Sequence, residues 1–489
     1  MQLINQNQML GILILAVVMR ATSLIYNELY LDLDPIWYSQ SRTAIILALS
    51  DIGRIDLNSE VEAFYRTSVK HSILIWPFMD RGLVYVHLIL KWLFGHTSYL
   101  SLQILQLVFD SILVFPIAAI GRRLGGNKAA MCSGLFYAVF IPQIWLATMP
   151  EYNVWLTYTF IILTWLMVIF IETFNQKAYG MAAVSAGAIL AVGFIGAQMR
   201  SIAVLAPLGF AGWYWLSLCF QNRTLRVSVT NFRIIILTVL IGISLVVGSS
   251  LVNGLIRGET SPVRSTFGHS FWAGIGQFDN PFDVQNYDDS IVQFYTKNTG
   301  IKDTGNTGGI EYNEWLTKRG LEFVQKEPSL YLSMVARRGL MILFPNMPFT
   351  IVADMPAYSL QETEIERVKH RKSLQAEYGR LSPVTISKLV KSDPAYVVGL
   401  MFRTFLLFAL PLGIISFLVL SLNRAIGMLA LFPLGYTLVT LSLFYITPVV
   451  LIPVYTAILP VVVTGWWLLY ERCRSLTYKK QTQRNSINS

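Results

Sequence analysis

The stretch "LQILQLVFDSILVFPIAAIGRRLGGNKAAMCSGLFYAVFIPQIWLA", residues 102–147, shows the pattern that decides the fold. Two apolar runs flank a short loop that carries Arg122, Arg123 and Lys128. A helix needs about 20 apolar residues to cross the hydrocarbon core of a bilayer, and cytoplasmic loops carry an excess of Lys and Arg. The stretch therefore predicts two membrane spans that are joined on the cytoplasmic side.

The rest of the chain repeats this pattern. Its 489 residues are 54% hydrophobic and only 13% charged, with a mean hydropathy of +0.52, whereas about a quarter of the residues in soluble globular proteins are charged. We expect an all-α polytopic membrane protein, a helical bundle of about ten or more spans. The predicted spans are residues 9–25, 98–119, 128–147, 153–171, 180–198, 201–220, 233–253, 396–421, 425–446 and 448–470.

The net charge of +10 comes from short loops between apolar runs and from the C-terminal tail. This distribution follows the positive-inside rule, so the charge reports topology, and we expect no nucleic-acid partner. With the basic loops in the cytoplasm, the N-terminus is cytoplasmic as well. Three regions then face the opposite side: residues 26–97, the turn at Glu151 and residues 254–395.

These spans divide the chain into three parts. Residues 1–253 are predicted to form a transmembrane module, and its first outer loop, residues 26–97, carries the candidate site. Residues 254–395 form an extracytoplasmic insert of loops and helices. Residues 396–489 hold the last spans and a basic cytoplasmic tail.

Two helices are predicted to lie along the outer membrane surface. Residues 34–50 turn mostly apolar after Asp34 and Pro35, and "GLVYVHLILKWLFG" at residues 82–95 is too short to cross a bilayer comfortably. A further apolar stretch, residues 330–353, is interrupted by Arg337 and Arg338, which favours an interfacial or re-entrant helix over a span.

The stretch "ELYLDLDPIWYSQ", residues 28–40, places three carboxylates directly after the first span. Asp34 precedes Pro35, and this pair is typical of a helix start with an aspartate cap. The alternative is a general base near the membrane surface, where partial burial raises the pKa of a carboxylate. Both interpretations of Asp34 stay open on local grounds, whereas Glu28 and Asp32 are expected to be solvated loop residues.

Two more charged residues stand on the same outer side. Glu151 follows Pro150 in a turn between apolar runs, so it either faces water at a helix start or belongs to a site. Arg200 lies between two spans, against the positive-inside bias. It either binds a phosphate or carboxylate or reaches the lipid headgroups. Arg20 and Arg81 are weaker candidates of the same kind, and Arg20 in particular is expected to reach the headgroups.

The sequence gives no sign of a metal or nucleotide site. His269 has no second metal-like ligand near it, and the three cysteines, Cys132, Cys219 and Cys473, do not have the spacing of metal ligands. No Walker loop, dinucleotide fingerprint, zinc motif or nucleophile elbow occurs in the sequence.

Together these positions resemble the GT-C superfamily of membrane glycosyltransferases, in particular its branch with protein O-mannosyltransferases and aminoarabinose transferases of bacterial type. That family places an acidic residue shortly after its first span, often as Asp-Glu with a Tyr four positions after the Asp. Asp34 and Tyr38 keep this spacing, and Pro35 stands in place of the Glu. The resemblance covers most of the chain through short motifs.

Other motifs of the family follow in order. Residues 82–95 are similar to its surface helix, which ends in Phe-Gly, and residues 102–156 look like its second to fourth spans. Glu151 falls on a Ser-Glu position and Arg200 on the Arg of a Thr-Arg-Pro run. Residues 268–282, which include His269, and residues 311–338 resemble the outer loop and following helix of bacterial members.

The chain also departs from the family pattern. Val449 and Val450 stand where the family usually has an Arg-Tyr pair, and the basic residue usually found before the surface helix is shifted to Arg81. These departures concern the contacts to the donor phosphate.

The resemblance implies an inverting transfer of a sugar from a polyprenyl-phosphate donor to an acceptor hydroxyl on the extracytoplasmic face of the plasma (inner) membrane. Asp34 would be the general base, Arg200 and Arg81 would hold the phosphate, and Glu151 would orient the acceptor. Tyr38 and His269 are further substrate-binding candidates. The acceptor would be a lipid, glycan or protein, and no obligatory cofactor or metal is implied.

Two other classes of function remain. A transporter, flippase or polymerase of lipid-linked glycans would have a similar number of spans, although the chain lacks the paired polar breaks at mid-span that transporters tend to have. A receptor or scaffold would use residues 254–395 to bind partners.

Overall fold

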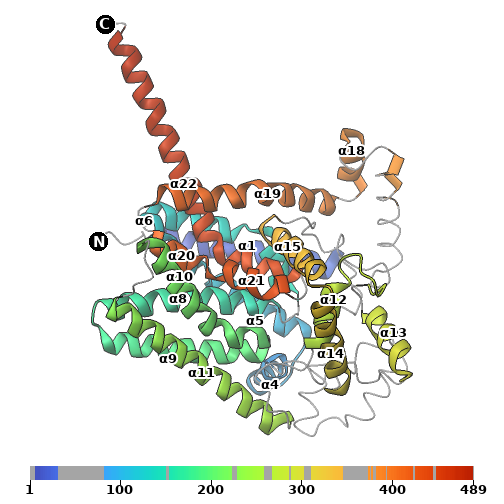
Figure 1. Ribbon diagram of the computed structural model, residues 1–489. Coiled ribbons are helices and arrows are strands. Elements are labelled where there is room, and N and C mark those ends of the chain that lie inside the picture. The colour runs from blue at the N-terminus through green and yellow to red at the C-terminus, as the bar shows by residue number, and fades with distance from the viewer. Residues whose placement is uncertain are drawn as a thin grey trace.

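The computed structural model describes residues 6–30, 82–149, 153–222, 228–257, 267–285, 288–301, 310–344, 370, 373–374, 376–377, 382–392, 394–421, 424–443 and 448–487. Every element within these ranges is a helix, so the all-α prediction is confirmed (Figure 1). Asp34, Tyr38, Arg81 and Glu151 lie outside the described residues.

A bundle of long helices forms the body of the molecule. Six helices in the described ranges are long and apolar enough to cross a membrane, and shorter apolar helices stand beside them. The long elements of the bundle are α1 (Gln6–Tyr30), α5 (Tyr99–Ile112), α6 (Val114–Ala138), α8 (Asn153–Asn175), α9 (Tyr179–Met199), α10 (Ala206–Asn222), α11 (Val229–Arg257), α19 (Pro394–Leu420), α21 (Phe432–Leu443) and α22 (Pro448–Ile487).

Four shorter elements connect or flank these helices. They are α4 (Gly82–Phe94), α7 (Ile141–Thr148), the 3-10 helix Ser201–Leu205 and α20 (Arg424–Ala430).

α6 consists of two helical segments joined by a sharp turn within the basic loop. Gly125 and Gly126 leave the helical conformation, and the φ of +79° at Gly126 is in the left-handed region that favours glycine. The chain folds back at this turn and brings the two segments into close contact. A Cβ on Gly121, in the first segment, would lie only 3.0 Å from the carbonyl oxygen of Ala129, in the second. The two apolar runs at residues 102–147 are therefore antiparallel.

The middle of the bundle is α22, which packs against α6, α8 and α19. Residues 451–465 of this helix are buried without a break. Beyond the bundle α22 continues as an isolated helix to Ile487, and Arg472 and Arg474 on this part of it are exposed (Figure 1). The basic tail is thus a direct extension of the central helix.

The insert has helices and an apolar core of its own. Its helices are α12 (Phe267–Ile275), α13 (Asp288–Thr299), α14 (Ile310–Lys326), α15 (Pro328–Leu343) and α18 (Pro383–Ser392). Aromatic side chains dominate the apolar cluster of α12–α15, with Trp272 at 0% exposure. α12, α13 and α14 lie on the side of the molecule away from the N-terminus (Figure 1). α15 has 16 residues, fewer than a span requires.

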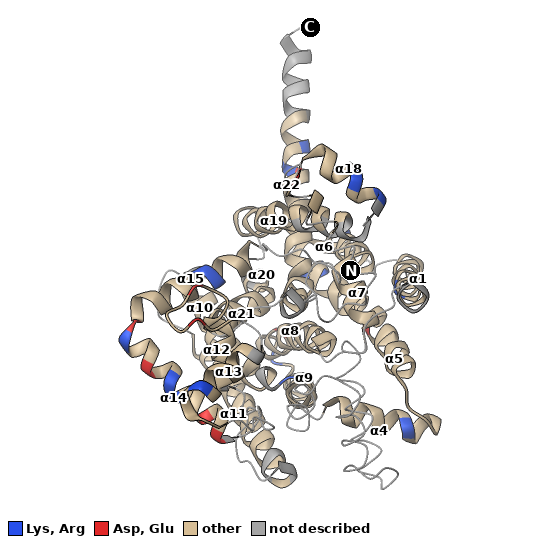
Figure 2. Cartoon of the chain, turned by 90° about the vertical axis from the view of Figure 1, so that its right-hand side faces the viewer, with Lys and Arg blue, Asp and Glu red and all other residues tan. Residues whose placement is uncertain are grey.

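Charged residues follow this division. In Figure 2 Lys, Arg, Asp and Glu stand out on α14, α15 and α18, whereas α8 and α9 in the bundle are almost entirely uncharged. This contrast is what a membrane-embedded bundle with a solvent-facing insert requires.

Candidate functional site

Of the predicted site residues, the structure describes Arg200 and His269. It also describes the helix ends beside the others: α1 ends four residues before Asp34, α4 begins directly after Arg81, and α7 and α8 flank the segment with Glu151. The candidate site can therefore be described through the helix ends that border it.

Arg200 ends α9 and begins the next element. Its backbone is extended, with φ −147° and ψ 110°, its N–H donates to the carbonyl of Gly196 at 2.7 Å, and its carbonyl accepts from the N–H of Ala203 at 2.9 Å. Arg200 itself is half-buried. The break in the helix thus places this arginine at the rim of the bundle, where a chain reversal separates α9 from α10.

The first residue of α4 packs tightly against this same rim. A Cβ on Gly82 would lie 2.8 Å from the carbonyl oxygen of Gln198 and 2.4 Å from Sδ of Met199, so only glycine fits there. The N-terminal end of α4 therefore abuts the C-terminal end of α9, two residues before Arg200. This neighbourhood was not predicted, because the sequence indicated a surface helix without indicating what its start contacts.

α4 differs from a simple surface helix in its burial. Its first half is buried, including Leu83, His87 and Leu90, whereas Trp92 and Phe94 near its end are exposed. Nδ1 of His87 lies 2.7 Å from Oγ1 of Thr97. Burial lowers the pKa of His87 to about 4, so this imidazole is neutral at physiological pH. α4 is thus held in the bundle by its N-terminal half.

The borders of the Glu151 segment are buried as well. Met149 is 1% exposed and Asn153, the first residue of α8, is 3% exposed. Nε2 of Gln103 on α5 donates to the carbonyl oxygen of Thr148 at 3.0 Å. The described residues on both sides of the Glu151 segment are therefore buried, and the end of α7 before it is held by a hydrogen bond from α5.

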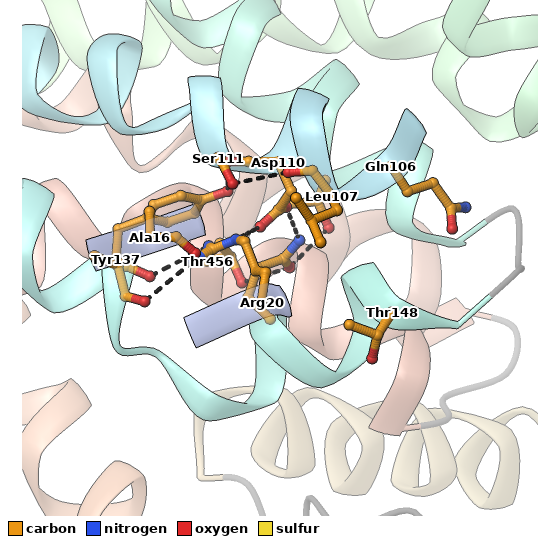
Figure 3. Close-up of polar contacts among 12 residues, drawn as sticks. Ala16, Arg20, Gln106, Leu107, Asp110, Ser111, Tyr137, Thr148 and Thr456 are labelled. Carbon is orange, nitrogen blue, oxygen red and sulfur yellow. Dashed lines mark hydrogen bonds and ion pairs between the residues drawn. The ribbon is translucent and has the colours of Figure 1, made fainter. Parts of the chain in front are cut away.

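Beneath these borders lies a charged pair that the sequence analysis did not identify. Nε of Arg20 on α1 donates to Oδ2 of Asp110 on α5 at 2.5 Å, and both side chains are fully buried. The expectation that Arg20 reaches the lipid headgroups is therefore wrong: Figure 3 shows its side chain between Tyr137 and Asp110 inside the bundle. Asp110, a lone acidic residue in an apolar run, was the signal that a partner was required.

In the insert, His269 makes contacts with α14. Nδ1 of His269 lies 3.0 Å from the hydroxyl of Tyr312, and the backbone N–H of His269 donates to Oδ1 of Asn313 at 3.2 Å. These contacts fix the start of α12 against α14. Within the described ranges, no three His, Cys, Asp or Glu side chains are grouped so that they could hold a metal ion.

The insert is joined to the bundle by a second buried arginine. Nε of Arg338 on α15 donates to the carbonyl oxygen of Ser442 at 2.6 Å, and Nη1 donates to that of Gly274 at 2.7 Å. Both carbonyls lie in the last turn of a helix, where the helix dipole is negative, and that of Gly274 also accepts from the backbone N–H of Gln277 at 3.4 Å. Burial lowers the pKa of Arg338 to about 10, which leaves it charged at neutral pH.

This arrangement favours an anion at the rim of the bundle. The N-terminal end of a helix carries partial positive charge and unpaired N–H groups, and Arg200 follows Gln198, which contacts Gly82, by two positions in the chain. A phosphate group fits both features, because guanidinium N–H groups match its oxygen atoms in pairs. The structure does not bring His269 into contact with Arg200 through any of its described hydrogen bonds.

Comparisons with known proteins give a likeness among solved structures. No family model matches the sequence, and no curated protein matches it. Among solved structures, the archaeal oligosaccharyltransferase AglB from Archaeoglobus fulgidus, in complex with an inhibitory peptide and a dolichol-phosphate, is similar with a TM-score of 0.40 and 11% sequence identity. The alignment covers 97% of this chain and 52% of that protein, so the chain spans about half the length of AglB.

Proposed function

We propose that the protein is a membrane glycosyltransferase that moves a sugar from a polyprenyl-phosphate donor to an acceptor hydroxyl on the extracytoplasmic face, with inversion at the anomeric carbon. The proposal rests on the motif spacing around Asp34, Glu151 and Arg200 in the sequence. We also propose that the protein belongs to the branch of the GT-C superfamily that contains protein O-mannosyltransferases and aminoarabinose transferases. A lipid, a glycan and a protein are all possible classes of acceptor.

The observation that carries the proposal is the contact between α4 and α9. It gives the half-buried Arg200 a helix N-terminus as a neighbour, and both features favour a phosphate. The leaving group of the proposed donor is a phosphate whose lipid tail stays in the bilayer. A phosphate site at the rim of an apolar bundle suits such a donor.

In the proposed reaction the acceptor oxygen forms a bond to the anomeric carbon while the bond from that carbon to the phosphate oxygen breaks. The hydroxyl proton passes to the carboxylate of Asp34, and the polyprenyl phosphate leaves from the opposite face of the sugar. Arg200, with Arg81, offsets the negative charge that develops on the departing phosphate. Glu151 orients the acceptor, and alignment of the two substrates supplies much of the rate.

The proposal is tested with the full chain in lipid nanodiscs and a panel of polyprenyl-phosphate hexoses and pentoses. Release of polyprenyl phosphate is measured together with transfer to lipid extracts, glycans or proteins, and the anomeric configuration of the product is determined. Asp34→Asn should reduce transfer at least 100-fold while expression and thermal unfolding stay unchanged. Asp32→Asn, two residues away, is the matched control and should retain activity.

Other outcomes would point elsewhere. Near-normal transfer by the Asp34→Asn variant would contradict the role of Asp34. Movement of an intact lipid-linked sugar across the bilayer, without release of polyprenyl phosphate, would identify a flippase. Absence of both activities with every donor would favour a scaffold or receptor that uses the insert.

A further inference from the structure

The buried pair Arg20–Asp110 acts at a break between two helices. α6 ends at Ala138 and α7 begins at Ile141, after Val139 with φ −107° and ψ 9°. The last carbonyls of a helix lack donors from the helix itself, and no bulk water reaches them inside an apolar bundle. Nη1 of Arg20 donates to the carbonyl of Ala138 at 3.1 Å, and Nη2 lies 3.5 Å from that of Tyr137. Arg20 thus supplies hydrogen-bond donors to the carbonyls at the C-terminal end of α6.

Asp110 connects the same point to α7. Its Oδ2 accepts from Arg20, and its Oδ1 accepts from Nε2 of Gln143 on α7 at 2.6 Å. Oε1 of Gln143 in turn accepts from the hydroxyls of Thr157 on α8 and Thr456 on α22, each at 3.2 Å. The direction in which α7 leaves the break is therefore fixed by side chains from α1, α5, α8 and α22.

Several further contacts hold the pair in place. Nη1 of Arg20 also donates to the carbonyl of Ala16 at 3.2 Å, and the guanidinium lies 4.9 Å from the centre of the Tyr137 ring. The hydroxyl of Tyr137 donates to the carbonyl of Asp110 at 2.9 Å. Figure 3 shows these groups converging between α1, α5 and α6. The position of Arg20 along and around α1 is thereby set.

Stability alone does not account for such a pair. Replacing a buried ion pair with apolar residues of similar volume is often neutral or stabilising, because two charges no longer have to be desolvated. An apolar pair would have no hydrogen-bond donors directed at the carbonyls at the end of α6 and no acceptor directed at Gln143. The pair therefore provides geometry that packing would not.

We propose that Arg20 and Asp110 are positioning residues that hold the outer ends of α1 and α7 in a fixed relation. Residue 31 follows α1 directly, and Pro150 follows α7 after a single described residue beyond its end. In the proposed transferase reaction these two helix ends carry the segments with Asp34 and Glu151. The inference that the pair serves catalysis rests on that proposed function, whereas its effect on α7 does not.

The test uses the double variant Arg20→Met with Asp110→Asn in nanodiscs. This variant removes both charges together, and Asn keeps an acceptor for Gln143. Hydrogen exchange of the backbone should accelerate at least 10-fold in residues 139–149, with changes below threefold in α9 and α11 and an unchanged midpoint of thermal unfolding. The kcat of sugar transfer should fall at least 10-fold, with the KM for the donor within twofold.

Two controls separate positioning from general stability. Arg123→Met with Glu172→Gln removes a second ion pair of α6, in which Nε of Arg123 lies 2.9 Å from both oxygens of Glu172, and should leave exchange in residues 139–149 and kcat unchanged. Arg20→Lys keeps the charge and the pairing to Asp110 but loses the guanidinium fork. The kcat of the Arg20→Lys variant should lie between those of the wild type and the double variant.

Hydrogen exchange and the kcat of sugar transfer test different parts of the proposal. If the wild-type protein transfers no sugar, the proposed function fails, and hydrogen exchange alone decides whether the pair fixes α7. Exchange that is unchanged in residues 139–149, or that accelerates equally in all helices, would overturn the proposal. A kcat within twofold of wild type, in a protein that does transfer sugar, would restrict the pair to a structural role and would also overturn it.

Discussion

Replacing Arg338 with Met should loosen the joint between the insert and the bundle. Arg338 is fully buried and donates to one carbonyl of α12 and one of α21. Met has a similar length and no donors, so the change keeps the packing and removes both hydrogen bonds. α12 belongs to the insert and α21 to the bundle, and both would lose the charged donor at their C-terminal end, while the carbonyl of Gly274 keeps a longer contact with the backbone N–H of Gln277 at 3.4 Å.

The magnitude follows from two opposing effects. A hydrogen bond from a charged donor contributes about 1.5–3 kcal/mol, so the loss of two destabilises the joint by about 3–6 kcal/mol. Removal of a buried cation returns part of its desolvation cost, which is several kcal/mol for an unpaired ion and less here because two helix C-termini face it. We expect a net loss of about 2 kcal/mol, which corresponds to about 30-fold more frequent local opening.

The joint should loosen without coming apart, because two other contacts remain. The hydroxyl of Tyr331 on α15 donates to the carbonyl of Leu443 at 2.7 Å, and that of Tyr455 on α22 donates to the carbonyl of Ile342 at 2.6 Å. Opening should therefore concentrate at α12 and in the part of α15 around Arg338, between Tyr331 and Ile342.

Hydrogen exchange followed by mass spectrometry, on the full chain in nanodiscs, measures this opening directly. Peptides from α12 and α15 should exchange about 30-fold faster in the Arg338→Met variant, while peptides from α8 serve as an internal reference. Arg337→Met is the matched control, because Arg337 is the adjacent arginine and is exposed. An increase below threefold in α12 and α15, or an equal increase in α8, would refute the assignment of Arg338 as the fastening residue.

Three further predictions follow from single contacts. Gly82→Ala should lower the free energy of unfolding in detergent by about 1–3 kcal/mol, because its Cβ meets the backbone of α9, whereas Gly180→Ala, in open space, should have almost no effect. The pKa of His87 is about 4 in the folded protein against 6.5 unfolded. As the pH falls, His87 is protonated at a higher pH in the unfolded chain than in the folded protein. The free energy of unfolding should therefore fall by about 3 kcal/mol as the pH drops from 6.5 to 4. His87→Gln should remove that part of the pH dependence in thermal unfolding. Arg123→Gln should cost less than about 1 kcal/mol, since its partly exposed pair with Glu172 is screened by water; a loss above 3 kcal/mol would contradict this.

The helical bundle could be predicted from sequence because membrane crossing is a local requirement. Each span must be apolar over about 20 residues, and each turn on the cytoplasmic side collects basic residues. The turn of α6 follows this rule, with Gly125 and Gly126 beside Arg122 and Arg123. These signals depend on neighbours in the chain, so one sequence is sufficient to find them.

The contacts around the candidate site depend on residues far apart in the chain. Arg20 and Asp110 are separated by 90 positions, and one sequence does not show which distant residue pairs with either of them. The fit of Gly82 against α9 likewise needs the packing angle of two helices, which hydrophobic periodicity does not determine. Asp34, Tyr38, Arg81 and Glu151 stay predictions, because they lie outside the described residues.

The two fully buried arginines share a physical role that separates them from Arg200. Arg20 donates to carbonyls at the end of α6, and Arg338 donates to carbonyls at the ends of α12 and α21. Helix ends at such depth have no bulk water to bind, so their carbonyls need donors from the protein. A guanidinium supplies several donors in one plane and attracts the negative end of the helix dipole.

This role explains why Arg20 and Arg338 stand outside the positive-inside pattern without binding a ligand. At Arg200 the helix end is closed by the backbone, since its own N–H donates to the carbonyl of Gly196 at 2.7 Å. Arg200 is also half-buried rather than enclosed. Arg200 therefore does not serve as the cap of a buried helix end, which separates it from Arg20 and Arg338.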